Sequence, residues 1–269
     1  MPINDREITS LKEHARSIRR AIIKLTTHAG AGHLGGALSV ADILTYLYFN
    51  ALKLTPRMSR DRLYLSAGHL CPTLYATLYE LGEIDEKELL TYGQFGTRLQ
   101  GHPSKVDWPA MESASGSLGQ GLSLALGAAL AYKLDRKTGA IYCVMSDGEQ
   151  EEGSVWEAAM AAAHYRTDNL IAIVDRNKLQ ISGSTENVIG LAPLGTKYRA
   201  FGWHVIDCDG HDFASLDHAV SRARQNDGPT AIIAETVMGK GIKSIENNAY
   251  WHSRIFDRAQ AAAARKELT

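Results

Sequence analysis

Acidic and amide side chains follow two apolar segments of the sequence, at the point where each segment ends. The segment AIYCVM is followed by Ser146, Asp147, Gly148 and Glu149, and the segment LIAIV by Asp175, Arg176 and Asn177. If both segments are parallel strands, Asp147 and Asn177 lie at the same edge of one sheet. A carboxylate beside an amide oxygen suits a hard cation such as magnesium or calcium, so these residue types indicate a metal site.

The residues just after Asp147 also favour an anion. A helix is predicted to begin near Gly153, and its amino-terminal N–H groups would point into the same space and attract a phosphate. Gly148 lets the backbone approach a ligand closely. The alternative is that Asp147 caps the following helix and Asn177 caps a turn, as Asp and Asn after strands often do. The pair by itself leaves both interpretations open.

Three histidines lie in glycine-flanked loops at the ends of predicted elements: His33 in GAGHLGG, His69 in SAGHLCP and His102 in QGHPS. Histidine suits proton transfer near neutral pH. A lone histidine is more often structural, but three in matching settings favour a functional cluster. His211, in CDGHD, is ambiguous. Five others lie within or beside regular elements and are predicted to have no special role: His14, His28, His164, His204 and His218.

Strands and helices are predicted to alternate along the chain. The predicted strands are RLYLSAG, AIYCVMS, NLIAIVD, WHVIDCD and TAIIAETV. Several are continuous apolar runs, which are typical of a parallel sheet with helices on both faces. The predicted fold class is therefore α/β, with a doubly wound, mainly parallel sheet, and ligands of such sheets bind beyond the carboxyl ends of the strands.

Three segments outside the strands carry more specific expectations. The segment GQGLSLALGAALAYKLDRK is apolar almost all round, which predicts a buried helix. Ser39 and Asp42 are expected to form an N-terminal cap pair. Residues 92–118 are predicted to form a loop, and loops of this length inside a compact domain are usually functional.

The composition of the 269-residue chain excludes several classes of protein. Its net charge of −1 includes no basic block, so neither nucleic acid nor an anionic membrane surface is an expected partner. No apolar run approaches the ~20 residues of a membrane-spanning helix, and the polar N-terminus does not resemble a signal peptide. Cys71, Cys143 and Cys208 are far apart and suggest neither zinc nor disulfides. A cytoplasmic location is expected.

A series of motifs in order resembles a known family. These motifs are GHLGG, SAGHLCPTLYA, GHPS, GSLGQGLSLALGAA, SDGEQEEGSVWEAAMAAAHYRTDNLIAIVDRNK and TVMGKGIKSIENNAYWH. Together they resemble the N-terminal, diphosphate-binding half of transketolase, a thiamine diphosphate enzyme, over nearly the whole chain. The resemblance implies that residues 1–269 are one diphosphate-binding domain. The pyrimidine-binding and C-terminal domains would lie on a partner chain, as in split enzymes with two copies of each chain.

The resemblance also implies roles for individual residues. The metal, Mg²⁺ with Ca²⁺ or Mn²⁺ as alternatives, would be held by Asp147, Asn177 and the backbone carbonyl of Leu179. Four histidines would surround the reacting carbon: His33, His69, His102 and His252. Thiamine diphosphate would further contact Gly116, Ser117, Leu118, Gly148, Glu149, Ile181 and Lys240. Glu152 would lie at the subunit contact, or alternatively serve only as an acid in the first turn of a helix. Leu118 and Ile181 are alternatively ordinary core residues.

Three positions depart from the family pattern. Ser146 replaces a glycine, Met238 replaces a frequent lysine, and Ser253 follows His252 where relatives often have glycine. Ser146 is expected to be tolerated if its backbone angles are ordinary. The loss of the lysine would remove a positive charge near the diphosphate, which Lys240 would have to replace.

The implied reaction transfers a two-carbon ketol unit from a ketose, or its phosphate, to an aldose, with histidines moving protons on sugar hydroxyls. The chain would be inactive without its partner, which carries the cofactor-activating glutamate. The alternatives are an unusual ketose substrate (a sulfosugar or a branched pentose), a catalytically silent binding subunit, and a 1-deoxyxylulose-5-phosphate synthase-like protein. A metal-dependent phosphohydrolase would use Asp147 but would not explain the Gly-His loops.

Overall fold

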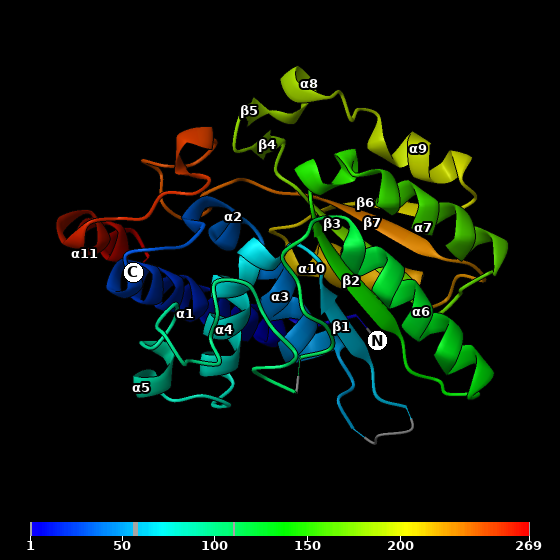
Figure 1. The fold of residues 1–269 in the computed structure, drawn as a ribbon, viewed down its shortest axis with the longest axis horizontal. Helices are drawn as coiled ribbons and strands as arrows, with labels where there is room; N and C mark the ends of the chain where they lie inside the picture. Colours follow the sequence, from blue (N-terminus) through cyan, green and yellow to red (C-terminus); the bar gives the residue numbers. More distant parts are fainter. Residues whose placement is uncertain (1, 56–58, 110, 269) are drawn as a thin grey trace.

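Five parallel strands form one sheet at the centre of the molecule, in the order β1-β2-β3-β7-β6 (Figure 1). The structure is a computed structural model that describes residues 2–55, 59–109 and 111–268. The strands of the sheet are β1 (Arg62–Leu65), β2 (Ile141–Ser146), β3 (Leu170–Arg176), β6 (His204–Asp209) and β7 (Thr230–Glu235). A small antiparallel pair, β4 (Leu179–Gln180) and β5 (Gly183–Ser184), follows β3. The predicted parallel sheet is confirmed.

Helices surround this sheet. The α-helices of the described residues are α1 (Asp5–Ala29), α2 (Leu34–Ser39), α3 (Ala41–Tyr46), α4 (Cys71–Glu80), α5 (Glu86–Leu89), α6 (Gln120–Leu134), α7 (Gly153–His164), α8 (Thr185–Val188), α9 (Leu194–Ala200), α10 (Phe213–Ala223) and α11 (Arg258–Glu267). Shorter helical turns are the π-helix Leu47–Ala51 and the 3-10 helices Gly68–Leu70, Gly148–Glu151 and Ala249–Trp251. None of the helices within the described ranges is both long enough and apolar enough to cross a bilayer.

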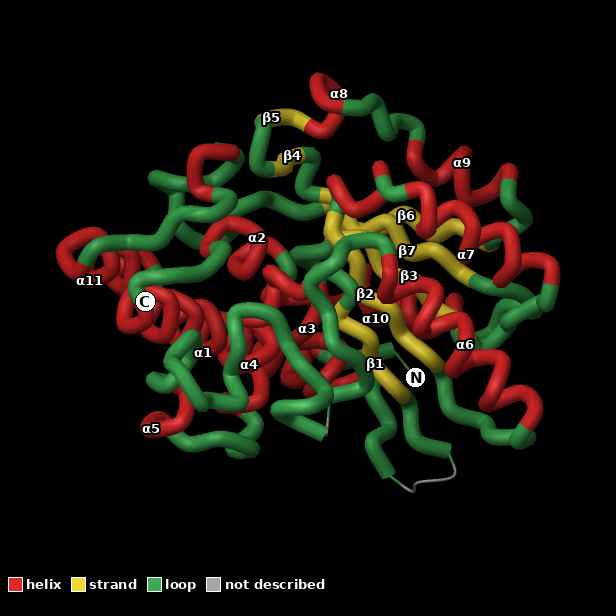
Figure 2. Tube along the Cα trace, in the orientation of Figure 1, coloured by secondary structure: helices red, strands yellow, loops and turns green. Residues whose placement is uncertain are grey.

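Each face of the sheet has its own hydrophobic core. Successive strand residues point to opposite faces. Tyr142 and Val144 of β2 therefore lie in the core formed with α1, α3, α4 and α10. Ile141, Cys143 and Met145 lie in the core formed with α6, α7 and α9. Figure 2 shows α6, α7 and α9 on one side of the strands and α1, α3 and α4 on the other. The sheet is thus doubly wound, as the sequence predicts.

The first helix illustrates how local sequence places a functional loop. The Asn4 side chain accepts hydrogen bonds from the backbone N–H groups of Arg6 and Glu7, and the Glu7 side chain accepts one from the Asn4 N–H (2.8 Å), so the two residues form a capping box. The helix ends at Gly30, whose φ of 69° is the left-handed conformation that glycine adopts most readily. The chain then turns toward His33, so the end of α1 determines where that histidine lies.

Two local predictions are wrong, and the first concerns Ser39 and Asp42. The helix continues from α2 through Val40 into α3 with helical backbone angles, so no helix start is left for these two residues to cap. Ser39 instead donates a hydrogen bond to Asp175 (2.7 Å), and Asp42 forms an ion pair with Arg19 (2.7 Å).

The second concerns α6, the helix predicted to be buried, which is buried on one face only. It packs on β1, β2 and α7, while Leu124 on its other face is 47% exposed and Leu134 near its end is 85% exposed. The amino-acid composition of α6 predicts apolar residues all round the helix, but it does not reveal that one of its faces is exposed to solvent in this chain.

Two other expectations are confirmed. Residues 92–118 form a connection without strands and without α-helices among the described residues, residue 110 lying outside them. Cys71, Cys143 and Cys208 are free and buried.

Candidate active site at the carboxyl edge of the sheet

Three of the four predicted histidines meet in one cluster. His33 precedes α2, His69 lies in the 3-10 helix after β1, and His252 follows the 3-10 helix Ala249–Trp251. Their ring centroids are 5.2 Å apart for His33 and His69, 5.4 Å for His69 and His252, and 5.7 Å for His33 and His252. The cluster joins segments that are about 220 residues apart in the chain, so only the fold brings them together.

Burial keeps these imidazoles uncharged at neutral pH. Burial, together with neighbouring histidines, lowers the pKa of His69 to about 3 and that of His252 to about 4. Burial also lowers the pKa of His33. The Nδ1 atom of His252 is buried and has no hydrogen-bond partner among the described residues. Neutral rings can both accept and donate a proton, which is what proton transfer to and from sugar hydroxyls requires.

The fourth histidine lies beside the loop that carries Gly116. A Cβ atom placed on Gly116 would lie 3.5 Å from the ring of His102, and one placed on Gly68 would lie 2.8 Å from the Gly116 nitrogen. The loops after β1 and before α6 therefore approach each other backbone to backbone, which requires glycine at position 68. Next along the chain, Ser117 is exposed and Leu118 packs against the core.

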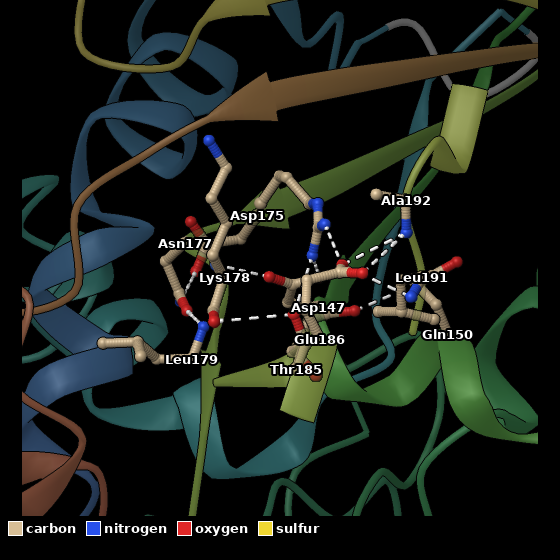
Figure 3. Close-up of polar contacts among 12 residues, drawn as sticks. Asp147, Gln150, Asp175, Asn177, Lys178, Leu179, Thr185, Glu186, Leu191 and Ala192 are labelled. Carbon is tan, nitrogen blue, oxygen red and sulfur yellow. Dashed lines mark hydrogen bonds and ion pairs between the residues drawn. The ribbon is translucent and has the colours of Figure 1, made fainter. Parts of the chain in front are cut away.

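Asp147 follows β2 and is buried by a ring of polar contacts (Figure 3). Its Oδ1 accepts a hydrogen bond from Arg176 Nη1 (2.5 Å), and its Oδ2 accepts one from the backbone N–H of Lys178. Burial raises the pKa of Asp147 to about 6, although the Arg176 guanidinium opposes this rise. Arg176 in turn contacts Thr185 (3.0 Å) and Glu186 (2.8 Å), so the residues after β5 help to hold the carboxylate.

Asn177 lies one residue past the end of β3, beside Asp147. The pairing of Ser146 with Asp175 in the parallel ladder places the ends of β2 and β3 next to each other. Lys178, between Asn177 and Leu179, has a φ of 66°, a left-handed conformation that turns the chain back toward Asp147. The prediction that Asp147 and Asn177 share one edge of the sheet is therefore confirmed by the geometry.

These residues fit a hard cation that is also held by phosphate oxygens. Asp147 and Asn177 supply a carboxylate oxygen and an amide oxygen, and Leu179 has a backbone carbonyl in the same segment. Within residues 2–55, 59–109 and 111–268, no group of three or more His, Cys, Asp or Glu side chains is arranged to hold a metal. A set with one carboxylate suits magnesium, which usually keeps only one or two protein carboxylates and takes phosphate oxygens besides.

The remaining predicted contacts occupy different places around this edge. A Cβ atom at Gly148 would lie 2.5 Å from Gln180 Oε1, so the Gly148 backbone itself forms the surface that neighbours approach. Ile181 is 67% exposed, which excludes ordinary core packing. Glu152 is exposed, directly precedes α7 and forms no side-chain capping bond, so no described contact occupies its carboxylate.

Glu149 and Lys240, for which the resemblance implies contacts to the cofactor, each contact other parts of the chain. The buried carboxylate of Glu149 accepts hydrogen bonds from the N–H groups of Gly119 (2.7 Å) and Ser146 (3.0 Å). It therefore holds the loop before α6 against the end of β2. Lys240 lines surface cavities beside His211, and its backbone carbonyl accepts a hydrogen bond from Arg19 (3.1 Å).

Two of the three departures from the family pattern, Ser146 and Met238, have structural explanations, and nothing in the structure explains Ser253. Ser146 ends β2 and is not among the residues with positive φ, so a side chain is accommodated there. Met238 is fully buried, and a Cβ atom placed on Gly35 would lie 2.9 Å from its Cγ. A lysine at this position would have to be buried beside α2.

His211, which the sequence leaves ambiguous, has a structural role. Its Nε2 accepts a hydrogen bond from the Val237 N–H (2.8 Å), and its Nδ1 lies 2.7 Å from Asp42 Oδ2.

Sequence reasoning missed the residues that hold Asp147 and Asn177 in place. Arg176 and Asp175 stand in the quoted DRN segment, but nothing in the sequence shows that one contacts Asp147 and the other Asn177. Glu186, which accepts hydrogen bonds from Arg176 and from Ala192 N–H (3.1 Å), has no local signal at all. The carboxylate spacing in sequence could not reveal these contacts because they join separate elements.

A doubly wound parallel sheet with histidines, a carboxylate and an amide at its carboxyl edge defines a cofactor-binding α/β domain. The model of the family "Transketolase, thiamine diphosphate binding domain" matches residues 10–269. The chain belongs to the transketolase family and is its N-terminal, thiamine-diphosphate-binding domain.

Several curated proteins are similar over nearly the whole chain. A subunit of the apulose-4-phosphate transketolase of Phocaeicola vulgatus is 38% identical over 98% of this chain and 95% of its own length. The 6-deoxy-6-sulfo-D-fructose transketolase subunit SqwG of Clostridium sp. is 40% identical over 96% of each chain. Human transketolase is 37% identical over 98% of this chain but only 43% of its own length.

Solved structures agree with this assignment. The transketolase of Campylobacter jejuni superimposes with a TM-score of 0.87 at 29% identity, over 99% of this chain and 46% of its own. The transketolase from Leishmania mexicana gives a TM-score of 0.89 at 27% identity, over 96% of this chain and 41% of its own. The chain therefore spans less than half the length of these solved transketolases.

Proposed function

We propose that this chain is the diphosphate-binding subunit of a two-chain transketolase that transfers a two-carbon ketol unit from a ketose to an aldose. The observation that carries the proposal is the convergence of three neutral histidines and the Asp147–Asn177 pair at the carboxyl edge of one sheet. A metal-dependent phosphohydrolase would need the carboxylate but not the histidine cluster.

Thiamine diphosphate supplies the electron sink for breaking and making the carbon–carbon bond. In the proposal, Asp147, Asn177 and the Leu179 carbonyl hold Mg²⁺, with Ca²⁺ or Mn²⁺ as alternatives. The Gly148 N–H faces the diphosphate, and Gly116, Leu118 and Ile181 border the cofactor. His33, His69, His102 and His252 accept and return protons of the sugar hydroxyls, and burial keeps the His69 and His252 rings neutral for this role.

The partner chain is proposed to complete the site. Two relatives that match this chain over nearly its whole length are named as subunits, which supports a separate partner chain. In the proposal, that partner carries the pyrimidine-binding domain, and the assembly contains two copies of each chain. The exposed apolar residues Leu124 on α6 and Met160 on α7, two helices that pack against each other, are suited to contact with that partner. Glu152, exposed just before α7, would lie at the same contact. Buried free cysteines accord with a cytoplasmic location.

The substrate is proposed to be an unusual ketose. The names of the two relatives give apulose 4-phosphate and 6-deoxy-6-sulfo-D-fructose as their substrates, so a branched or sulfonated sugar is favoured over an ordinary sugar phosphate. Both kinds of sugar carry an anionic group at the end remote from the reacting carbonyl. A panel of phosphorylated and sulfonated ketoses, tested with the complete pair of chains, distinguishes these candidates.

The proposal is tested by titrating thiamine diphosphate with Mg²⁺ into the purified pair and into this chain alone, by calorimetry. Tight binding is expected only for the pair, and Asp147→Ala should abolish it. The matched control is Asp168→Ala, because Asp168 is an exposed acid whose ion pair with Lys133 (2.7 Å) lies away from the site. Absence of binding in the native pair would contradict the proposal and favour a catalytically silent chain.

A further inference from the structure

The two ends of the Asn177 amide are chemically opposite, so its orientation decides whether it can bind a cation. Oδ1 carries lone pairs and can coordinate a metal, whereas the N–H groups of Nδ2 repel one. A flip of the amide would therefore convert a ligand into an obstacle without changing the shape of the side chain. Some neighbouring group must fix the orientation.

The neighbours of Asn177 fix its orientation from both ends. Nδ2 donates hydrogen bonds to Asp175 Oδ2 (3.1 Å) and to Ser39 Oγ (3.3 Å). Oδ1 accepts from the backbone N–H of Leu179 (3.0 Å) and has a second lone pair free. A carboxylate can only accept and a backbone N–H can only donate, so the opposite orientation would set like groups against each other at both ends.

Asp175 is itself anchored in the core at the end of β3, where it is fully buried. Its Oδ1 accepts hydrogen bonds from the hydroxyl groups of Ser39 (2.7 Å) and Thr236 (2.5 Å). Because the single proton of Ser39 is used there, its oxygen is left to accept from Asn177. The carboxylate thus joins α2, β3 and the segment after β7. Its partners Ser39, Thr236 and Asn177 are all buried.

We infer that Asp175 is a positioning residue that turns the amide oxygen of Asn177 toward the divalent cation of the proposed cofactor site. The inference rests on the proposed function, since it concerns the same cation. Asp is suited to the position because both of its oxygens accept, one from the two hydroxyls and the other from the amide. An asparagine there offers an acceptor on one side only.

The test is Asp175→Asn in the complete pair of chains, with Mg²⁺ titrated at saturating thiamine diphosphate. The variant is nearly isosteric and loses one acceptor, so Mg²⁺ affinity should fall about tenfold, the range typical of groups that orient metal ligands. The matched control is Thr236→Val, which removes a hydrogen bond from the same carboxylate and a contact to Ser39 Oγ (3.1 Å) but no contact to Asn177 itself. It should change Mg²⁺ affinity by less than about twofold.

A second substitution separates orientation from general damage. In Asp175→Asn with Asn177→Asp, the side chain at 177 presents an oxygen in either orientation, so it needs no orienting acceptor. Most of the lost Mg²⁺ affinity should return, even if the unfolding temperature does not recover. If the single variant does not accumulate as a folded pair, Ser39→Ala replaces it, since Ser39 alone of the two hydroxyls also accepts from Asn177.

Each outcome has a defined meaning. Undiminished Mg²⁺ affinity in Asp175→Asn, equal losses in Asp175→Asn and Thr236→Val, or no rescue by the double variant would overturn the inference. In the fallback comparison, equal affinities for Ser39→Ala and Thr236→Val would do the same. If the native pair binds neither the cofactor nor Mg²⁺, the proposed function itself fails, and that result is visible before any variant is measured.

Discussion

At the residue scale, the site combines neutral histidines with a buried carboxylate that is paired with an arginine. The three clustered histidines are half-buried, and both burial and the neighbouring histidines disfavour their charged forms, so their pKa values fall. Asp147 keeps its place by contacts to Arg176 and to the Lys178 backbone. A buried carboxylate without such partners would be strongly unfavourable, which explains why an arginine ends the strand β3 beside Asp147.

The histidine cluster makes a prediction about the dependence of stability on pH. The pKa of His69 is about 3 in the folded chain against 6.5 as its ordinary value, so between these values the unfolded state binds more protons. The free energy of unfolding should therefore have its full value above about pH 6.5 and should decrease as the pH is lowered from there toward about 3. In His69→Asn this fall should be smaller, as measured by urea unfolding at about pH 7 and about pH 5.

Exposed His204 provides the control, since it pairs with Asp227 at the surface (3.0 Å) and lies outside the cluster. His204→Asn should lose as much unfolding free energy between the two pH values as the native chain does. If His69→Asn behaves in the same way as His204→Asn, burial of the histidine cluster does not control the acid sensitivity of the chain.

At the element scale, the segment after β3 is tied to the site by side chains more than by backbone pairing. β4 and β5 contain two residues each, and α8 contains four. Arg176 and Glu186 supply the connection, because Glu186 binds the guanidinium and the N–H groups of Leu191 and Ala192 (3.3 and 3.1 Å). Ile181, proposed to border the cofactor, lies within this segment.

Removing the Glu186 carboxylate should loosen this segment without unfolding the domain. In Glu186→Gln the charge-assisted contacts to Arg176, Leu191 and Ala192 weaken, so amide hydrogen exchange in residues 185–192 should become several-fold faster. The midpoint of global unfolding should hardly change. Glu13→Gln on the exposed side of α1 is the control. Unchanged exchange at residues 185–192 would show that the backbone alone orders the segment.

At the scale of the whole molecule, the side formed by α6 and α7 exposes apolar residues to solvent. Helix α6 shows an apolar surface on the side away from the sheet, and Met160 on the neighbouring α7 is 52% exposed. Exposed apolar surface that is gathered on neighbouring helices often marks a site of interaction with another protein. The chain also covers less than half of the solved transketolases it superimposes on. Both observations agree with a partner that covers α6 and α7.

A charge on α6 should prevent assembly. Leu124→Asp places a carboxylate where the partner would exclude water, so co-purification with the partner chain should be lost and the dissociation constant should rise at least tenfold, roughly the cost of burying one unpaired charge at an interface. The isolated chain should remain as stable as the native one, because Leu124 is already 47% exposed. Leu54→Asp is the control, being 48% exposed at a different place, before β1. Equal binding by both variants would exclude α6 from the interface.

The sequence by itself determined the parallel α/β fold, the family and the edge at which Asp147 and Asn177 meet. These features depend on local signals: continuous apolar strands, glycine-flanked histidines and polar residues directly after strand ends. Only the tertiary structure showed that Ser39 and Asp42 do not cap a helix and that one face of α6 is exposed. It alone also revealed the contacts of Glu149, Asp175 and Arg176. Such contacts join side chains from separate elements, and burial and hydrogen-bond partners exist only once those elements have packed together.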